Sequence, residues 1–155
     1  MARALRLTLT VVSSGDLRFP AEVHRARLDV DSALDHLRAE GGNPGYSTID
    51  QLRAELVRQR LLDLISSDPL LRTGVGERIA AYDRRHDTQF SSTLLAFLRH
   101  FGDIPTTSTE LLIHQNTARQ RLRRCRELFD LDLDSSAQRL LLELELTAEA
   151  QSPEG

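Results

Sequence analysis

The residues of this chain that are best suited to chemistry form one polar run, in which amide and guanidinium groups occur with almost no carboxylate between them. Asn and Gln can each form two hydrogen bonds with adenine, and Arg can do the same with guanine. Arg side chains later in such a run can hold phosphates of the nucleic-acid backbone. The run therefore predicts DNA contacts by Gln115, Asn116, Arg119, Gln120, Arg123 and Arg126.

Positive charge is concentrated in this part of the chain. The net charge of −3 provides no overall attraction to nucleic acid, although all 20 basic residues are Arg. Residues 114–128 alone carry five Arg residues against the single acid Glu127. Any affinity for nucleic acid must therefore come from a local surface.

A helix is expected to carry the polar run. Between about His114 and Phe129 an apolar stripe recurs at helical spacing, formed by Ala118, Leu122, Cys125 and Phe129. The amide and guanidinium groups then lie on the solvent-facing side of the same helix. His114 opens the helix, where its ring can cap the first turn, contact a phosphate, or do both.

A short helix is expected just before it. Residues 107–112 fit such a helix, with Thr106 or Thr107 as its N-cap and a tight turn after it. This order is that of a helix-turn-helix, in which a short supporting helix positions a second helix whose first residues meet base edges in the major groove. The alternative is an Arg-rich face that is only solvated. The short capped helix, the turn and the amides together favour DNA binding.

Two more helices are expected in the C-terminal part. The first starts at Phe90 and stops at Gly102–Pro105, and its apolar face consists of Phe90, Leu94, Phe97, Leu98 and Phe101. The second runs from Asp134 or Ser135 to about Ala148. Its alternation of Leu and Glu over residues 142–146 leaves a strand as the alternative.

The N-terminal half mixes strands and helices. Residues 4–13 alternate in hydropathy, which predicts a strand whose buried side carries Leu5, Leu7, Leu9 and Val11. A helix from Pro20 is expected to end at Gly41-Gly42, and residues 46–49 fit a second strand.

A longer helix is expected to follow the second strand. Asp50 suits its N-cap, Asp68-Pro69 stops it, and its buried face includes Leu52, Leu56, Leu61 and Ile65. A short helix over residues 77–82 and a polar link over residues 83–89 complete this half.

A stretch of about 65 residues, which begins at Asp83 and ends in a segment with Asp134, Arg139 and Leu142 that is similar to the closing helix of the family, resembles a known family of bacterial regulators. The resemblance to the C-terminal helix-turn-helix of the PucR/CdaR family is carried by residues 107–133, TSTELLIHQNTARQRLRRCRELFDLDL. The preceding linker and first helix of that family are similar to residues 83–103, DRRHDTQFSSTLLAFLRHFGD. The His-x-Asn-Thr turn and the Leu-Asp-Leu end are its specific motifs.

The resemblance implies a Fis-like helix-turn-helix domain that binds double-stranded DNA. It assigns DNA contact or turn formation to His114, Asn116, Thr117 and Arg119. Arg121 is implied to be structural or phosphate-binding.

The chain departs from the family pattern at Gln115, Ala118 and Gln120, where Arg, Leu and Tyr are common. These departures imply weaker DNA binding or a different preferred DNA sequence. Residues 5–65 also look like the C-terminal half of the GGDEF-like domain that precedes this helix-turn-helix in CdaR-type proteins, without a diguanylate-cyclase signature.

Other kinds of site have little support in the sequence. The single cysteine, Cys125, cannot form an intrachain disulfide, and the five His residues lack metal-binding spacing. Residues 130–134 begin like a calcium loop, but Ser135 and Leu141 stand where Gly and Glu are required. Since no catalytic grouping and no membrane-spanning stretch is recognisable, we expect a cytoplasmic protein that is not an enzyme and has no cofactor.

The sequence as a whole predicts a mainly α fold with a small N-terminal β element (α+β). The expected domains are residues 1–85, a remnant of a GGDEF-like domain, residues 86–150, the helix-turn-helix domain, and residues 151–155, a disordered tail. The expected function is transcription regulation by a DNA-binding homodimer whose recognition helix spans about residues 114–129, with an unknown effector. The alternative is a truncated paralogue that acts as a dimerisation module and binds DNA weakly or not at all.

Overall fold

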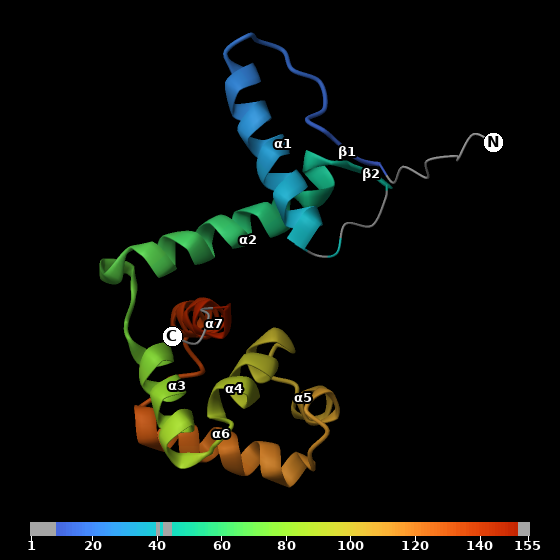
Figure 1. Ribbon diagram of the computed structural model, residues 1–155. Helices are drawn as coiled ribbons and strands as arrows, with labels where there is room; N and C mark the ends of the chain where they lie inside the picture. Colours follow the sequence, from blue (N-terminus) through green and yellow to red (C-terminus); the bar gives the residue numbers. More distant parts are fainter. Residues whose placement is uncertain (1–8, 40, 42–44, 152–155) are drawn as a thin grey trace, which may run out of the picture. The chain divides into compact units, whose positions relative to one another are not determined.

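The computed structural model describes residues 9–39, 41 and 45–151. It is mainly helical with one small parallel sheet near the N-terminus, which confirms the expected fold class (Figure 1). The elements in chain order are β1 (Thr10–Ser13), α1 (Glu22–Ala39), β2 (Gly45–Thr48), α2 (Ile49–Ser67), the 3-10 helix η1 (Pro69–Leu71), α3 (Val75–His86), α4 (Phe90–Arg99), α5 (Ile104–Glu110), α6 (Gln115–Phe129) and α7 (Ser136–Gln151).

The chain divides into two compact units, residues 1–60 and 61–155. The second unit thus begins before the domain boundary expected near residue 85. The reason is α3, which packs against α4 and α7 and places the fully buried Ile79 in their shared core. A helix expected to end the first domain therefore lies in the same unit as α5 and α6.

In the first unit, β1 and β2 pair in parallel, and α1 packs against β1. Val12 faces the covered side, where it meets a small core formed by Ala33, Ile49 and Leu56. The expectation that Leu9 and Val11 are buried is wrong, since these side chains are 71% and 41% exposed. Side chains alternate along a strand, so burial of Val12 turns Val11 outward. Leu5 and Leu7 lie outside the described residues.

Helix α2 begins one residue before the expected cap. Thr48 Oγ1 accepts a hydrogen bond from Gln51 N (3.3 Å), and Gln51 Oε1 accepts one from Thr48 N (2.9 Å). This reciprocal pair is a capping box, so Thr48 caps the helix and Asp50 lies in its first turn. Further along, Leu62 rather than the expected Leu61 is buried, because Leu62 packs against α7.

The second unit has one main hydrophobic core, shared by α3, α4, α6 and α7. Its buried members are Ile79, Phe90, Leu94, Leu98, Leu122, Cys125, Phe129, Leu133, Leu142 and Leu146. Each large apolar side chain buried in this way contributes about 1.5–3 kcal/mol to folding. Residues 142–146 lie within α7, so the strand alternative is wrong. At the start of α7, Ser135 Oγ accepts a hydrogen bond from Gln138 N (3.4 Å).

A buried carboxylate joins α7 to the start of α3. Glu145 is 4% exposed, and its carboxylate accepts hydrogen bonds from the backbone N of Thr73 and from Gly76 N, the latter at 2.9 Å. These N–H groups have no partner within their own helix, and the negative charge complements the helix dipole. The backbones approach closely here, because a Cβ added at Gly76 would lie 2.8 Å from Glu145 Cβ.

A second carboxylate joins α3 to α4. Asp83, in α3, accepts hydrogen bonds from Phe90 N (2.9 Å) and Ser91 N (2.8 Å) at the start of α4. The polar link expected over residues 83–89 is therefore too long, since Asp83–His86 still belong to α3. Only three residues remain between the two helices, which fixes α4 closely against α3.

Helix α5 starts earlier than expected. Asp103 caps it by accepting a hydrogen bond from Thr106 N (2.8 Å), and Pro105 occupies its first turn, where its missing N–H costs nothing. Neither Thr106 nor Thr107 is the cap. Hydrogen bonds from Thr106 also hold the pKa of the Asp103 carboxyl below its ordinary value.

The expectation that Phe101 lies on the apolar face of α4 is also wrong. The helix ends at Arg99, and the chain then turns through left-handed backbone at Phe101 (φ 53°) and Gly102 (φ 89°). As a result the Phe101 ring is 94% exposed.

The Gly76→Ala variant is expected to lose about 1–2 kcal/mol of unfolding free energy, although Ala favours helices over Gly by about 1 kcal/mol. The new methyl group would collide with Glu145 Cβ and push α3 away from α7. Urea unfolding followed by far-UV circular dichroism measures the change. Gly45→Ala is the matched control, because a Cβ there meets nothing within 4 Å. Equal urea midpoints for the two variants would contradict the close α3–α7 contact.

Candidate nucleic-acid interface

A tight turn over residues 111–114 joins α5 to α6 (Figure 1). Ile113 N donates to Ser108 O (3.0 Å), and Leu112 N donates to Thr109 O (3.2 Å). Leu112 adopts a left-handed backbone (φ 54°), which reverses the chain direction. The short α5, this turn and the longer α6 have the arrangement of a helix-turn-helix, with α6 as the second helix.

His114 caps α6. Its backbone is extended (φ −71°, ψ 144°), and its Nδ1 accepts a hydrogen bond from Asn116 N (3.1 Å). The ring therefore carries its proton on Nε2 when neutral. Since the first turn of α6 holds no acidic residue, the partial positive charge of the helix N-terminus meets no carboxylate there. An anion is favoured at such an end.

The apolar stripe of α6 is confirmed, because Ala118, Leu122, Cys125 and Phe129 are all buried. Ala118 is fully buried where the resembling family commonly has Leu, so the small side chain still packs inside the core. Burial raises the pKa of the Cys125 thiol to about 12, with a smaller contribution from the charge of Asp83. Fixing this stripe against α4 and α5 fixes which side chains of α6 face solvent.

Three of the predicted contact residues form a single cluster at the exposed start of α6. Arg119 Nη1 donates to Asn116 Oδ1 (3.2 Å), and Arg119 Nη2 donates to Gln115 Oε1 (3.2 Å). All three side chains are exposed. We call Gln115, Asn116 and Arg119 the amide–arginine cluster. Its members present both donors and acceptors to solvent, as contact with base edges requires.

The remaining predicted contacts are arranged less closely. Gln120 and Arg123 are exposed and make no hydrogen bond or ion pair with the described part of the chain. Thr117 is partly buried, which fits turn formation better than an outward contact. Arg124 is a further exposed arginine that the motif did not include, and its place one turn after Gln120 was the available signal.

Two arginines of α6 contact other parts of the unit. Arg121 Nη1 donates to Gln89 Oε1 (2.9 Å) and lies 3.4 Å from Thr93 Oγ1, which ties α6 to the start of α4. This contact matches the structural role implied for Arg121. Arg126 is exposed, as expected, and its guanidinium also lies 3.4 Å from the Asp134 carboxylate.

Residues 90–148 match the family model of the PucR C-terminal helix-turn-helix domain. This segment is therefore similar to the helix-turn-helix domain of PucR-type proteins. The matched segment runs from the first residue of α4 into α7, so it contains α5, the turn and α6. It includes neither α3 nor the first unit, and the GGDEF-like resemblance of residues 5–65 has no counterpart in it. No curated protein and no solved structure matches the chain.

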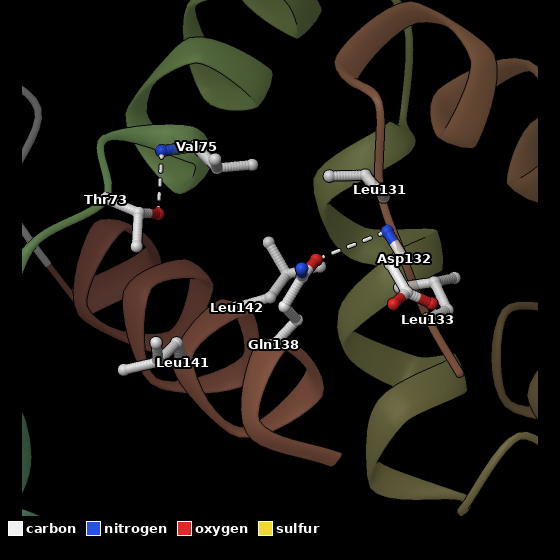
Figure 2. A pocket seen from close by; sticks show the side chains of 8 residues that line it. All are labelled: Thr73, Val75, Leu131, Asp132, Leu133, Gln138, Leu141 and Leu142. Carbon is white, nitrogen blue, oxygen red and sulfur yellow. Dashed lines mark hydrogen bonds between the residues drawn. The ribbon is translucent and has the colours of Figure 1, made fainter. Parts of the chain in front are cut away.

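Hollows adjoin the helix-turn-helix domain at α6 and at the start of α3. An open hollow of about 390 Å³ has Arg119, Arg123 and Arg126 along the α6 side and apolar side chains, including Ile104 and Phe97, opposite. The second, about 280 Å³, lies between the start of α3, residues 131–133 and α7 (Figure 2). None of the predicted DNA contacts lines the second hollow, so the arginine-edged one is the hollow next to the candidate interface.

In residues 9–39, 41 and 45–151, no group of three or more His, Cys, Asp or Glu side chains is placed to hold a metal ion. The helices of these residues include none that combines the length and the apolar character needed to span a bilayer.

The Cys125 thiol is expected to resist thiol reagents in the folded domain at about pH 8, since the thiolate is the reactive form. Its pKa rises from the ordinary 9.0 to about 12, so folding favours the protonated thiol. The contribution of the protonated thiol to the free energy of unfolding is fully present below about pH 9 and is lost as the pH rises through about 12. Labelling of native and urea-unfolded protein measures the first effect. The Cys125→Ala variant should lose the part of the decrease in unfolding free energy between about pH 9 and about pH 12 that the thiol causes. Rapid labelling of Cys125 in the native protein would contradict the burial on which both expectations rest.

Proposed function

We propose that this protein is a DNA-binding transcription regulator of the PucR/CdaR type, with α6 as its recognition helix. The observation that carries the proposal is the PucR-type match over residues 90–148, which contains α6 with its exposed amide–arginine cluster. The double-stranded DNA partner follows from the chemistry of these side chains, since amides suit adenine and guanidinium suits guanine in the major groove. We assign the protein no enzymatic role.

The amide–arginine cluster suits base recognition because its side chains are already ordered. In the free protein, the Arg119 guanidinium donates hydrogen bonds to the side-chain amide oxygens of Gln115 and Asn116. These bonds are exposed and 3.2 Å long, so their exchange for bonds to bases costs little. Holding long side chains in place beforehand reduces the entropy that binding removes.

Phosphate contacts come from groups beside the cluster. The side chains of Gln120 and Arg123 are exposed on the next turns of α6 and have no hydrogen-bond or ion-pair partner among the residues that the structure describes. The N-terminus of α6, where the His114 ring accepts a hydrogen bond from Asn116 N, adds a partial positive charge. Because the chain carries a net charge of −3, affinity depends on these few groups rather than on overall charge.

A homodimer completes the proposed function. One helix-turn-helix contacts few base pairs, and dimers of such domains bind two half-sites about one helical turn apart. We place this dimer in the bacterial cytoplasm, in keeping with a regulator of genes. Residues 1–85 are proposed to derive from a GGDEF-like domain, since two parallel strands joined through α1 are consistent with such a remnant.

A second candidate function is favoured by the departures from the family pattern. Gln115 and Gln120 stand where Arg and Tyr are common, so this chain offers fewer positive and aromatic contacts to DNA. A paralogue with these changes would act as a dimerisation module with weak or no DNA binding. Titration of labelled genomic DNA at two salt concentrations separates the candidates, because only the regulator shows salt-sensitive binding.

Arg123→Ala is expected to weaken binding to all DNA sequences about equally and to lower the slope of log affinity against log salt by about one unit. The physical reason is the loss of one phosphate contact and of the counterion that it releases. Fluorescence anisotropy across a salt series measures the slope. Arg84→Ala in α3 is the control, since Arg84 is exposed and lies outside the helix-turn-helix. An unchanged slope for Arg123→Ala would count against a phosphate contact.

Asn116→Ala is expected to reduce the ratio of specific to non-specific affinity by about tenfold, because one pair of base contacts contributes roughly 1–3 kcal/mol of discrimination. Arg119→Ala should act in the same direction. Selection of genomic fragments by the wild-type protein supplies the specific site, and a scrambled duplex supplies the reference. Equal losses on both duplexes would assign Asn116 to the backbone instead of to a base.

A further inference from the structure

Phe101 is an aromatic side chain held in solvent by a strained backbone. Its ring is 94% exposed, and its φ of 53° is one that a bulky residue rarely adopts. The conformation is fixed locally, because Phe101 N donates to Leu98 O (3.0 Å) and Gly102 N donates to Phe97 O (2.8 Å). Both the strain and the exposure are unfavourable for an isolated chain. A partner surface that covers the ring would remove its exposure to solvent.

A hollow of about 190 Å³ lies directly beside this ring. Phe101 itself forms part of its wall, together with Phe97 and Gly102 at the end of α4. The opposite wall is the first half of α7, where Leu140 is 57% exposed. An apolar projection and an apolar recess of the same surface are therefore neighbours.

Opposite charges flank the recess. Arg139 and Glu143 stand one turn apart on α7, and both line the hollow. Each is only partly exposed, yet neither forms an ion pair with any residue in the described part of the chain. A surface with one unpaired positive group and one unpaired negative group beside it is complementary to a two-fold copy of itself.

We propose that Phe101, Arg139, Leu140 and Glu143 form a dimer surface that binds the same surface of a second copy of this chain. In this two-fold contact, Phe101 enters the recess of the other copy, and Arg139 pairs with Glu143 of the partner subunit. The choice of a second copy rests in part on the proposed function, since a helix-turn-helix needs two half-sites. The surface shares no residue with the predicted DNA contacts of α6.

Phe101→Gly tests the surface without endangering the fold, because glycine suits the left-handed backbone that Phe101 strains. The dimer dissociation constant is expected to rise about tenfold or more, as for a central aromatic contact. Sedimentation equilibrium over a concentration series measures it on the full chain. Leu112→Gly is the matched control, since Leu112 is 91% exposed with φ 54° and lies outside this surface. Leu112→Gly should leave the dissociation constant unchanged.

Charge reversal tests the pairing itself. Arg139→Glu alone and Glu143→Arg alone should each dissociate the dimer, because like charges then face each other. An equimolar mixture of these two variants should restore a dimer, since each copy supplies the charge that the other lacks. Purely structural damage by either substitution would not be repaired by mixing.

The outcomes separate this proposal from the proposed function. A monomeric wild-type chain, a dimer unaffected by Phe101→Gly, or a mixture that stays monomeric would each overturn the dimer surface. Binding to a single half-site at low salt is measured in parallel on the same variants. If the wild-type chain does not bind the half-site, the regulator assignment is overturned, whether the chain is a monomer or a dimer. A monomeric chain that binds the half-site overturns only the proposed dimer surface.

Discussion

The carboxylate of Glu145 holds α3 against α7. A series of polar contacts then connects α3 to α4 and α4 to α6. Glu145 accepts backbone hydrogen bonds from the start of α3, and Gly76 allows the two backbones to meet there. Asp83, at the far end of α3, then caps α4. The start of α4 in turn receives Arg121 from α6. The exposed face of α6 is thus set by a series of polar contacts through the unit, in addition to its apolar stripe.

Periodicity predicted the parts of this unit that depend on apolar spacing. The buried stripe from Ala118 to Phe129 was found because every fourth or third residue is apolar, which only a helix places on one face. Glu145 could not be found in this way. In sequence it is one charged residue in an alternation of Leu and Glu, and only the position of α3 makes it a buried cap. The prediction that Phe101 lies on the apolar face of α4 was wrong, because the apolar spacing typical of a helix continues to Phe101 although the helix itself ends at Arg99.

The candidate interface was predictable to a similar extent. Exposure of Gln115, Asn116 and Arg119 follows from the same stripe, since residues opposite a buried face must meet solvent. Their mutual hydrogen bonds do not follow, because side chains three and four positions apart on a helix can either pair or remain separate. Helical periodicity alone did not distinguish Arg121 from Arg123, and only the family resemblance implied a structural role for Arg121. Both are arginines of one helix, and the position of α4 alone determines which of them is engaged.

The caps of the helices show how stability and function diverge at His114. Carboxylates accept backbone hydrogen bonds at the starts of α3, α4 and α5, supplied by Glu145, Asp83 and the N-cap Asp103, whereas at the start of α6 the acceptor is an imidazole. An Asp at position 114 would satisfy the same N–H group and would also complement the helix dipole, so the helix alone would favour it. It would also put a negative charge where a phosphate must approach. A cap that is not a carboxylate supplies the hydrogen bond and leaves the positive end of α6 open to an anion, which is the condition that DNA binding places on this helix.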